Sequence, residues 1–162
     1  MSLIRKATIS DVEAIKEIIN AYAKKGLMLP RATYELYETV RDVYVAEENG
    51  IVVGCCAIHI YGKEYKENVT TDTVLGEIRS LAVLPEMQGR DIGTELLKCA
   101  MNDAKSLGLT NLFTLTYVKD FFAKQGFNEI NRHELLQKIW SGCKGCIKFP
   151  DACDETAMAR KI

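Results

Sequence analysis

The segment of residues 75–108 restricts the fold of this chain more than any other. Residues 75–84 predict a strand that is nearly apolar after Arg79, as expected of a central strand. Pro85 ends this strand, and a loop containing Gly89 and Gly93 leads directly into a helical pattern. That pattern places apolar residues at helical spacing and ends at a glycine: Ile92, Leu96, Ala100, Ala104, Leu107 and then Gly108. A buried strand, a glycine loop and a long helix in this order indicate an α/β domain.

The flanking segments predict the other strands and helices of one mixed sheet. Ser10 and Glu13 have the spacing of a capping box at the start of a helix over residues 12–22. Asn49 and Gly50 are a strong signal for a hairpin turn, and the polar residues 62–71 predict a loop. Three consecutive strands followed by two helix–strand pairs predict an α/β (α+β) sheet with helices on both faces. The predicted strands cover residues 3–7, 43–46, 51–60, 75–84, 112–115 and 127–130, and short helices are predicted over 33–39 and 121–125.

Composition and charge narrow the class of protein. The 162 residues have the length of a single domain, 1–162, in which we expect 133–162 to be a cysteine-containing tail packed on the rest. The formal net charge is −1, which argues against a large nucleic-acid-binding face. No apolar run is long enough to span a membrane, and the start lacks the apolar centre of a signal peptide. These features predict a soluble cytoplasmic chain with no membrane partner.

The loop between the central strand and its helix is a candidate anion site. Helix N-termini offer unpaired amides and a positive dipole end, and glycine lets the backbone approach a phosphate closely. The glycine spacing by itself is equally typical of an ordinary strand-to-helix turn.

Two motifs resemble those of the GNAT superfamily of N-acetyltransferases. Residues 88–93, Gln-Gly-Arg-Asp-Ile-Gly, resemble the family's acetyl-CoA signature [Q/R]-x-x-G-x-[G/A], and residues 81–85 match the Val-x-Pro strand end before it. Residues 121–127 resemble the second signature, Tyr-x-x-x-Gly-Phe. The resemblance implies a mostly antiparallel central sheet and acetyl-CoA as co-substrate.

A narrower resemblance extends beyond the acetyl-CoA motif. Residues 4–8, 26–31, 53–57, 112–117 and the tail are similar to the acetyltransferase domain of N-acetylglutamate synthases. This implies a short stand-alone amino-acid N-acetyltransferase, with L-glutamate as the expected substrate and arginine biosynthesis as the expected pathway.

The resemblance also assigns roles to particular residues. The backbone of Leu81, Ala82 and Val83 would pair with the pantetheine arm, and the Val83 amide would face the thioester oxygen as an oxyanion donor. The remaining residues expected at acetyl-CoA are Gln88, Gly89, Arg90, Asp91, Ile92, Gly93, Thr94 and Phe122.

Glu77 is the candidate general base, acting through a water on the substrate amine. The two-residue period of a strand places it on the same face as Arg79, although a purely structural ion pair would give the same spacing. Arginine matches a carboxylate in bidentate fashion, so the expected cations for an amino-acid substrate are Arg31, Arg79 and Lys138. Solvent-exposed surface cations remain the alternative, above all for Lys138.

Two residues depart from the family pattern. Asp91 stands where the signature prefers glycine, and its carboxylate would repel a pyrophosphate unless Arg90 offsets it. Phe122 stands where many relatives carry the tyrosine that protonates the departing thiolate. Tyr117 is a candidate substitute for that acid.

The cysteines allow a further alternative. Cys143, Cys146 and Cys153 have a ligand-like spacing, but a single Cys-x-x-Cys pair favours free thiols, and we expect no catalytic metal. Cys55 and Cys56 lie in an apolar strand and are expected in the core. Four functions stay open: the amino-acid acetyltransferase, acetylation of another small amine or protein amino group, a non-catalytic acyl-CoA sensor, and a metal-linked interaction module. Many family members dimerise, so a homodimer also stays open.

Overall fold

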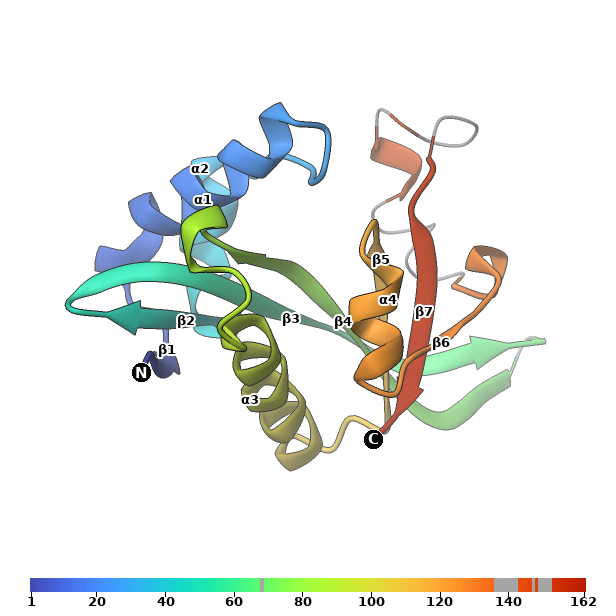
Figure 1. The fold of residues 1–162 in the computed structure, drawn as a ribbon. Coiled ribbons are helices and arrows are strands. Elements are labelled where there is room, and N and C mark those ends of the chain that lie inside the picture. Colours follow the sequence, from blue (N-terminus) through green and yellow to red (C-terminus); the bar gives the residue numbers. More distant parts are fainter. Residues whose placement is uncertain (68, 136–142, 147, 149–152) are drawn as a thin grey trace. The chain divides into compact units, whose positions relative to one another are not determined.

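The computed structural model describes the whole chain except residues 68, 136–142, 147 and 149–152 (Figure 1). The helices are α1 (Val12–Lys24), α2 (Thr33–Glu38), α3 (Ile92–Ser106) and α4 (Lys119–Lys124). The strands are β1 (Leu3–Lys6), β2 (Val43–Glu48), β3 (Ile51–Lys66), β4 (Val69–Val83), β5 (Asn111–Thr116), β6 (Asn128–Glu129) and β7 (Thr156–Lys161).

The described strands form one sheet in the order β1-β2-β3-β4-β5-β7-β6. β1 and β2 pair antiparallel, as do β2 and β3, β5 and β7, and β6 and β7. β4 and β5 are parallel, with Glu77 opposite Phe113. The predicted mixed, mostly antiparallel sheet is confirmed.

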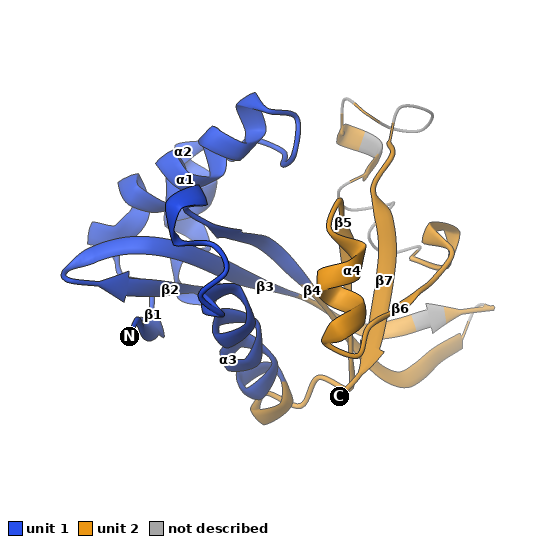
Figure 2. Cartoon of the chain, in the orientation of Figure 1, with its two compact units in different colours: residues 1–59, 78–104 blue, residues 60–77, 105–162 orange. Residues whose placement is uncertain are grey.

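The chain divides into two compact units (Figure 2). Unit 1 contains residues 1–59 and 78–104, and unit 2 contains residues 60–77 and 105–162. β3 and β4 each pass from one unit into the other, and β4 does so between Glu77 and Ile78.

In unit 1, helices cover both faces of the sheet (Figure 1). Val43 and Val45 of β2 pack with the apolar stripe of α1, which includes the buried Ile15 and Ile19. Alternate residues of β2 and β3 point to the opposite face, where Leu96 of α3 comes close to the backbone of β3. Burial on both faces explains why β2 begins with four consecutive buried residues.

In unit 2, the last strand was missed by the sequence prediction, which treated residues 133–162 as a tail. β7 inserts between β5 and β6, with Phe113 opposite Ala159. A core cluster joins Phe113 to Ala157 of β7, and Phe122 of α4 is buried in the same unit. β7 thus provides the backbone hydrogen-bond partners for the edge of β5 that β4 leaves open.

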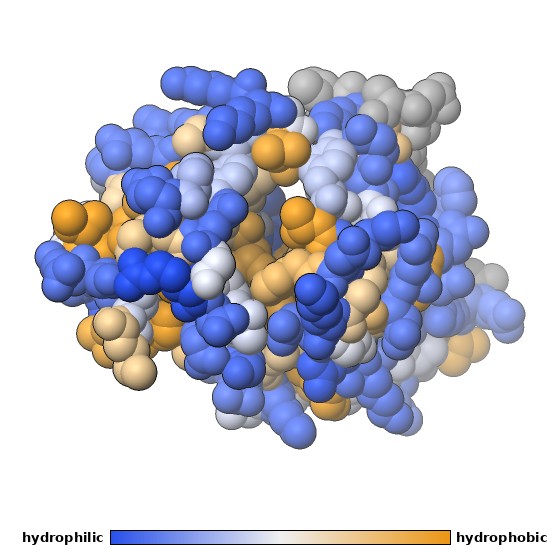
Figure 3. All heavy atoms as spheres, in the orientation of Figure 1, coloured by the Kyte–Doolittle hydropathy of each residue, from blue (hydrophilic) through white to orange (hydrophobic). Residues whose placement is uncertain are grey.

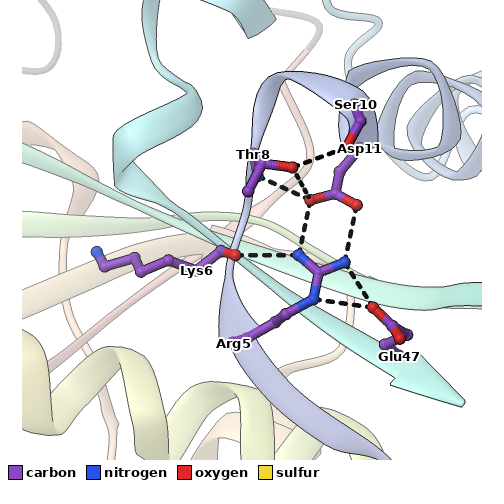
Figure 4. A network of polar contacts seen from close by, with 6 residues as sticks. All are labelled: Arg5, Lys6, Thr8, Ser10, Asp11 and Glu47. Carbon is purple, nitrogen blue, oxygen red and sulfur yellow. Dashed lines mark hydrogen bonds and ion pairs between the residues drawn. The ribbon is translucent and has the colours of Figure 1, made fainter. Parts of the chain in front are cut away.

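The start of α1 differs from the predicted Ser10–Glu13 capping box. A box of Thr8 and Asp11, two residues earlier, caps a short 3-10 helix (Ile9–Asp11) that leads into α1, and in it the Thr8 amide donates to Asp11 Oδ2 at 2.7 Å. Arg5 then binds Asp11 through two hydrogen bonds, of 2.7 and 2.9 Å, and also binds Glu47 (Figure 4). The Arg5 guanidinium holds the pKa of Asp11 down to about 2.

The turn at Asn49–Gly50 is confirmed, with φ angles of 53° and 78° that match a two-residue hairpin. The loop predicted over residues 62–71 is wrong, because β3 and β4 extend through most of it. Leu107 was expected in the helical stripe, but α3 ends at Ser106 and Leu107 is 59% exposed.

Hydrophilic residues cover most of the face drawn in Figure 3, and hydrophobic ones appear there in separate places. Within the described part of the chain, no helix is long and apolar enough to cross a membrane.

Candidate active site

The C-terminal part of β4, in unit 1, contains an irregular residue. Ser80 has φ of 52° inside the strand, in the left-handed region, and its carbonyl oxygen accepts a hydrogen bond from Cys55 Sγ at 3.3 Å. The next three residues are Leu81, Ala82 and Val83, which were expected to bind the pantetheine arm.

Gly54 of β3 explains the tight packing beside this strand end. A Cβ atom there would lie 3.1 Å from the Ala82 carbonyl oxygen and 3.1 Å from Leu96 Cδ1. Both contacts are closer than a side chain normally tolerates, so only glycine lets α3 and β4 approach β3 at this point. Cys55 and Cys56 beside it are fully buried, as expected, and burial raises the pKa of Cys55 to about 12.

The loop from β4 to α3 presents the features that an anion site needs. The first hydrogen bond of the helix joins the Glu95 amide to the Asp91 carbonyl, 3.0 Å apart. The amides of Ile92, Gly93 and Thr94 precede it, where a helix has no carbonyl to offer them. Gly89 has φ of 74° and nothing within 4 Å of a Cβ position, so the backbone is open there. This donor set fits the pyrophosphate of acetyl-CoA.

Asp91 occupies the position where the signature prefers glycine, and the geometry gives the reason for that preference. Its φ of 61° lies in the left-handed region that glycine enters freely and aspartate tolerates better than most residues. The side chain is exposed. A residue held in this conformation within a ligand loop stores local strain.

Arg90 does not neutralise Asp91 by direct pairing in the way that the sequence suggested. Its Nη2 lies 2.7 Å from Glu48 Oε1 at the end of β2. The pKa of Glu48 is lowered by this hydrogen bond. The Arg90 guanidinium therefore pairs with a carboxylate of β2.

Glu77 lies in unit 2 and is only 4% exposed. Tyr61 of β3 donates its hydroxyl hydrogen to Glu77 Oε2 at 2.9 Å. The Tyr61 ring also packs on Phe113, with 5.6 Å between ring centroids. Tyr61 therefore has a polar role in addition to the packing role that its sequence position suggested.

Tyr117 follows the last residue of β5, also in unit 2. Its hydroxyl lies 2.6 Å from Asp154 Oδ1 and also contacts Lys148 Nζ. Burial raises the pKa of Tyr117, Asp154 raises it further, and Lys148 opposes the shift. The phenol therefore stays protonated near neutral pH and can act as a proton donor.

The other predicted residues are distributed over both units. Arg31 is half-buried between α1 and α2, and Arg79 is half-buried in β4. Phe122 is buried in unit 2, with its ring edge-on to Phe121 and Phe127. Lys138 lies outside the described residues.

The cysteines of the tail form no recognisable ligand cluster. Across the described ranges, no three side chains of His, Cys, Asp or Glu come together to hold a metal ion. Cys143, Cys146 and Cys153 are half-buried, and none of them is in a disulfide.

Comparison with known proteins identifies the family. The family model described as "Acetyltransferase (GNAT) domain" matches residues 39–129, more than half of the chain. The chain belongs to the GNAT acetyltransferases. Members of this family take the acetyl group from acetyl-CoA.

Relatives extend the similarity to almost all of the acetyltransferase. It is 38% identical over 98% of its length to an uncharacterized N-acetyltransferase of Chlorobaculum tepidum, of which it covers 96%. It is 39% identical over 85% of its length to the amino-acid acetyltransferase of Mycobacterium tuberculosis, of which it covers 75%.

Solved structures show the same fold. Rv2747 of Mycobacterium tuberculosis, in complex with CoA and NLQ, superposes with a TM-score of 0.79 at 32% identity and covers 99% of both chains. The N-acetylglutamate synthase of Neisseria gonorrhoeae, with coenzyme A and N-acetyl-glutamate, gives a TM-score of 0.79 at 25% identity. That match covers 99% of this acetyltransferase but 35% of the synthase chain.

Sequence reasoning about the acetyltransferase did not find its tyrosine partners. Tyr22 contacts Val83 and Gln88, and Tyr61 contacts Glu77, over separations of sixteen residues or more. The spacing of Tyr22 in the apolar stripe of α1 predicted burial, but no local pattern reports a contact between distant segments.

Proposed function

We propose that this acetyltransferase transfers the acetyl group of acetyl-CoA to the α-amino group of an amino acid, with L-glutamate as the substrate. The observation that carries the proposal is the 39% identity to an amino-acid acetyltransferase over 85% of the chain. The likeness to a synthase structure holding N-acetyl-glutamate supports the choice of glutamate. A place in arginine biosynthesis and a cytoplasmic location are part of the same proposal.

Glu77 is the proposed general base. The amine of an amino acid is mostly protonated near neutral pH, so its proton must be removed before nitrogen attacks the thioester carbon. A buried carboxylate that accepts a hydrogen bond from Tyr61 has a restricted orientation, which is what a base that acts on one amine needs. We therefore assign Tyr61 as the residue that orients Glu77.

Two groups act on the thioester in this proposal. The Val83 amide donates a hydrogen bond to the carbonyl oxygen as negative charge develops there. Tyr117 donates its hydroxyl proton to the sulfur as the carbon–sulfur bond breaks. Lys148 contacts the same hydroxyl and would stabilise the phenolate that this transfer leaves.

Arg31 and Arg79 are the proposed cations for the substrate carboxylates. Glutamate carries two carboxylates, and the guanidinium group pairs with each in a planar, bidentate manner. Lys138 is retained as a third candidate from the sequence.

The test follows release of free CoA with each of the twenty amino acids offered separately. We expect turnover confined to glutamate, a loss of about 100-fold or more in kcat for Glu77→Gln, and a raised KM for glutamate in Arg31→Ala. Tyr37→Phe on exposed α2 is the matched control and should leave both constants unchanged.

Three other results would contradict the proposal in distinguishable ways. Turnover of a different amine would retain the chemistry and discard glutamate. Turnover unaffected by Glu77→Gln would discard the base. Acetyl-CoA binding without turnover of any amine would indicate an acyl-CoA sensor.

A further inference from the structure

The hydroxyl of Tyr22 joins three segments of unit 1. Tyr22 lies near the C-terminal end of α1 and donates its hydrogen to the carbonyl oxygen of Val83, the last residue of β4. The same oxygen accepts a hydrogen bond from Gln88 Nε2 at 2.6 Å. A phenol has one donor and two acceptor positions, so both contacts can be made at once.

The peptide group between Val83 and Leu84 is held from both sides. Its carbonyl accepts from Tyr22, and the Leu84 amide donates to the Val53 carbonyl of β3 at 2.9 Å. The orientation of this peptide determines the direction in which the chain leaves β4. It also fixes the Val83 residue, whose amide is the proposed oxyanion donor.

The Tyr22 ring is held in place by the core of unit 1. It packs, partly buried, against the core cluster that joins α1 to β2 and β3. Burial raises the pKa of Tyr22 above its ordinary value, so the hydroxyl keeps the hydrogen that it donates to Val83.

The loop that follows needs such a support. Asp91 has φ of 61°, a conformation that a residue other than glycine keeps only where surrounding contacts determine it. Two side chains attach the loop to other segments: Gln88 to Tyr22, and Arg90 to Glu48. The first contact lies at the strand end beside the core, and the second is on the surface.

We propose that Tyr22 is a positioning residue for acetyl-CoA: it locks the signature loop to the end of β4 through Gln88 and the Val83 carbonyl. The Gln88 side chain thereby shapes the loop, and the amides of the loop are left to contact the ligand. This inference requires that the loop binds acetyl-CoA, but it does not depend on which amine receives the acetyl group.

The direct test is the dissociation constant of CoA, measured by calorimetry without any amine. Tyr22→Phe removes only the oxygen, and Gln88→Met removes the amide at nearly constant volume. We expect each change to weaken CoA binding about tenfold, the equivalent of about one lost hydrogen bond of 1.4 kcal/mol. Tyr22→Phe removes the contacts to both Gln88 and the Val83 carbonyl, and Gln88→Met removes only the first, so the double variant should bind CoA no more weakly than Tyr22→Phe alone. Tyr34→Phe, an exposed tyrosine of α2, is the matched control.

A second measurement separates positioning from a general loss of structure. Hydrogen exchange at the amides of residues 86–94 in the free protein should accelerate in Tyr22→Phe, while the amides of β2 keep their protection. Gln88 is exposed, so its variant leaves the core intact if Tyr22→Phe proves unstable.

Unchanged CoA affinity in Tyr22→Phe or Gln88→Met would overturn the inference, as would losses that multiply in the double variant. Failure of glutamate as a substrate would overturn the proposed function and leave this result standing.

Discussion

Two arginine–carboxylate clusters lie on consecutive residues of β2 and differ in almost every property. Glu47 binds Arg5 and, through it, Asp11 at the start of α1 (Figure 4). Glu48 binds Arg90 in the loop before α3. The Glu47 cluster contains a carboxylate that is only 6% exposed, Asp11, whereas 46% of the Arg90 side chain is exposed.

The difference shows that the contribution of an arginine–carboxylate pair to stability depends on how deeply the pair is buried. Arg5 of β1 binds Glu47 of β2 and Asp11 at the start of α1, and Asp11 also accepts from the Thr8 amide. The Glu47 cluster therefore joins β1, β2 and the start of α1.

In the Glu48 cluster the Glu48 side chain is 17% exposed but the Arg90 side chain is 46% exposed, and an ion pair with such an exposed cation contributes little and is screened by salt. We interpret the Glu47 cluster as a stabiliser of the fold. We interpret the Glu48 cluster as a pair that keeps the Arg90 cation near the loop between β4 and α3.

The largest expected effect is on the Glu47 cluster. Arg5→Met leaves the Asp11 carboxylate buried without its cation, which costs about 3 kcal/mol of unfolding free energy. Urea denaturation monitored by circular dichroism measures it. Arg90→Met is the matched control and should lower stability far less; equal losses in the two variants would remove the distinction between the clusters.

Acid should weaken the same cluster by a predictable amount. The pKa of Asp11 is lowered to about 2 in the folded protein from 3.8, so its contribution is complete above pH 4 and is lost as the pH falls to 2. At 1.36 kcal/mol for each pKa unit, the loss is about 2 kcal/mol. Urea unfolding of the wild type between pH 5 and pH 2 measures it. Asp11→Asn should flatten this part of the pH profile, and a profile as steep as that of the wild type would contradict the assignment.

A smaller effect is expected in the ligand loop beside Arg90. Asp91→Gly removes a negative charge near the expected pyrophosphate and suits the left-handed conformation. The repulsion is about 1 kcal/mol in water, so acetyl-CoA should bind about fivefold more tightly. Calorimetric titration tests this. Asp91→Asn, which removes the charge and keeps the size, separates the two causes; unchanged or weaker binding in Asp91→Gly would refute the prediction.

The smallest effect concerns the stability contribution of the Glu48 cluster. Arg90→Gln breaks the exposed pair with Glu48, and we expect the unfolding midpoint to shift by less than about 2 °C. Thermal scans at low and high salt measure it, and any shift should vanish at high salt. A larger shift that persists in 1 M salt would show that this pair also anchors the fold.

Local patterns in the sequence predicted the elements that local forces form. The Asn49–Gly50 turn, the apolar stripe of α1 and the strand–loop–helix segment were all predicted and observed. Each depends on backbone preference or on side-chain spacing within a few residues. The sequence prediction placed the capping box two residues too late in the chain. Thr8 and Asp11 have the same spacing as Ser10 and Glu13, and the ion pair of Arg5 with Asp11 favours the earlier pair.

Features that join distant segments were not predictable in this way. β7 was missed because its short mixed sequence becomes a strand only when β5 and β6 lie on either side of it. The links from Tyr22 to Gln88 and from Tyr61 to Glu77 depend on where the folded chain places each hydroxyl.

The sequence by itself determined the class of fold, the ligand loop and the residue types available for acetyl transfer, because spacing and backbone preference act over short stretches. The tertiary structure alone decided which side chains are paired, and so which of two neighbouring glutamates anchors the fold. A hydrogen bond requires two groups within about 3 Å, and for residues far apart in the chain only folding brings them to that distance.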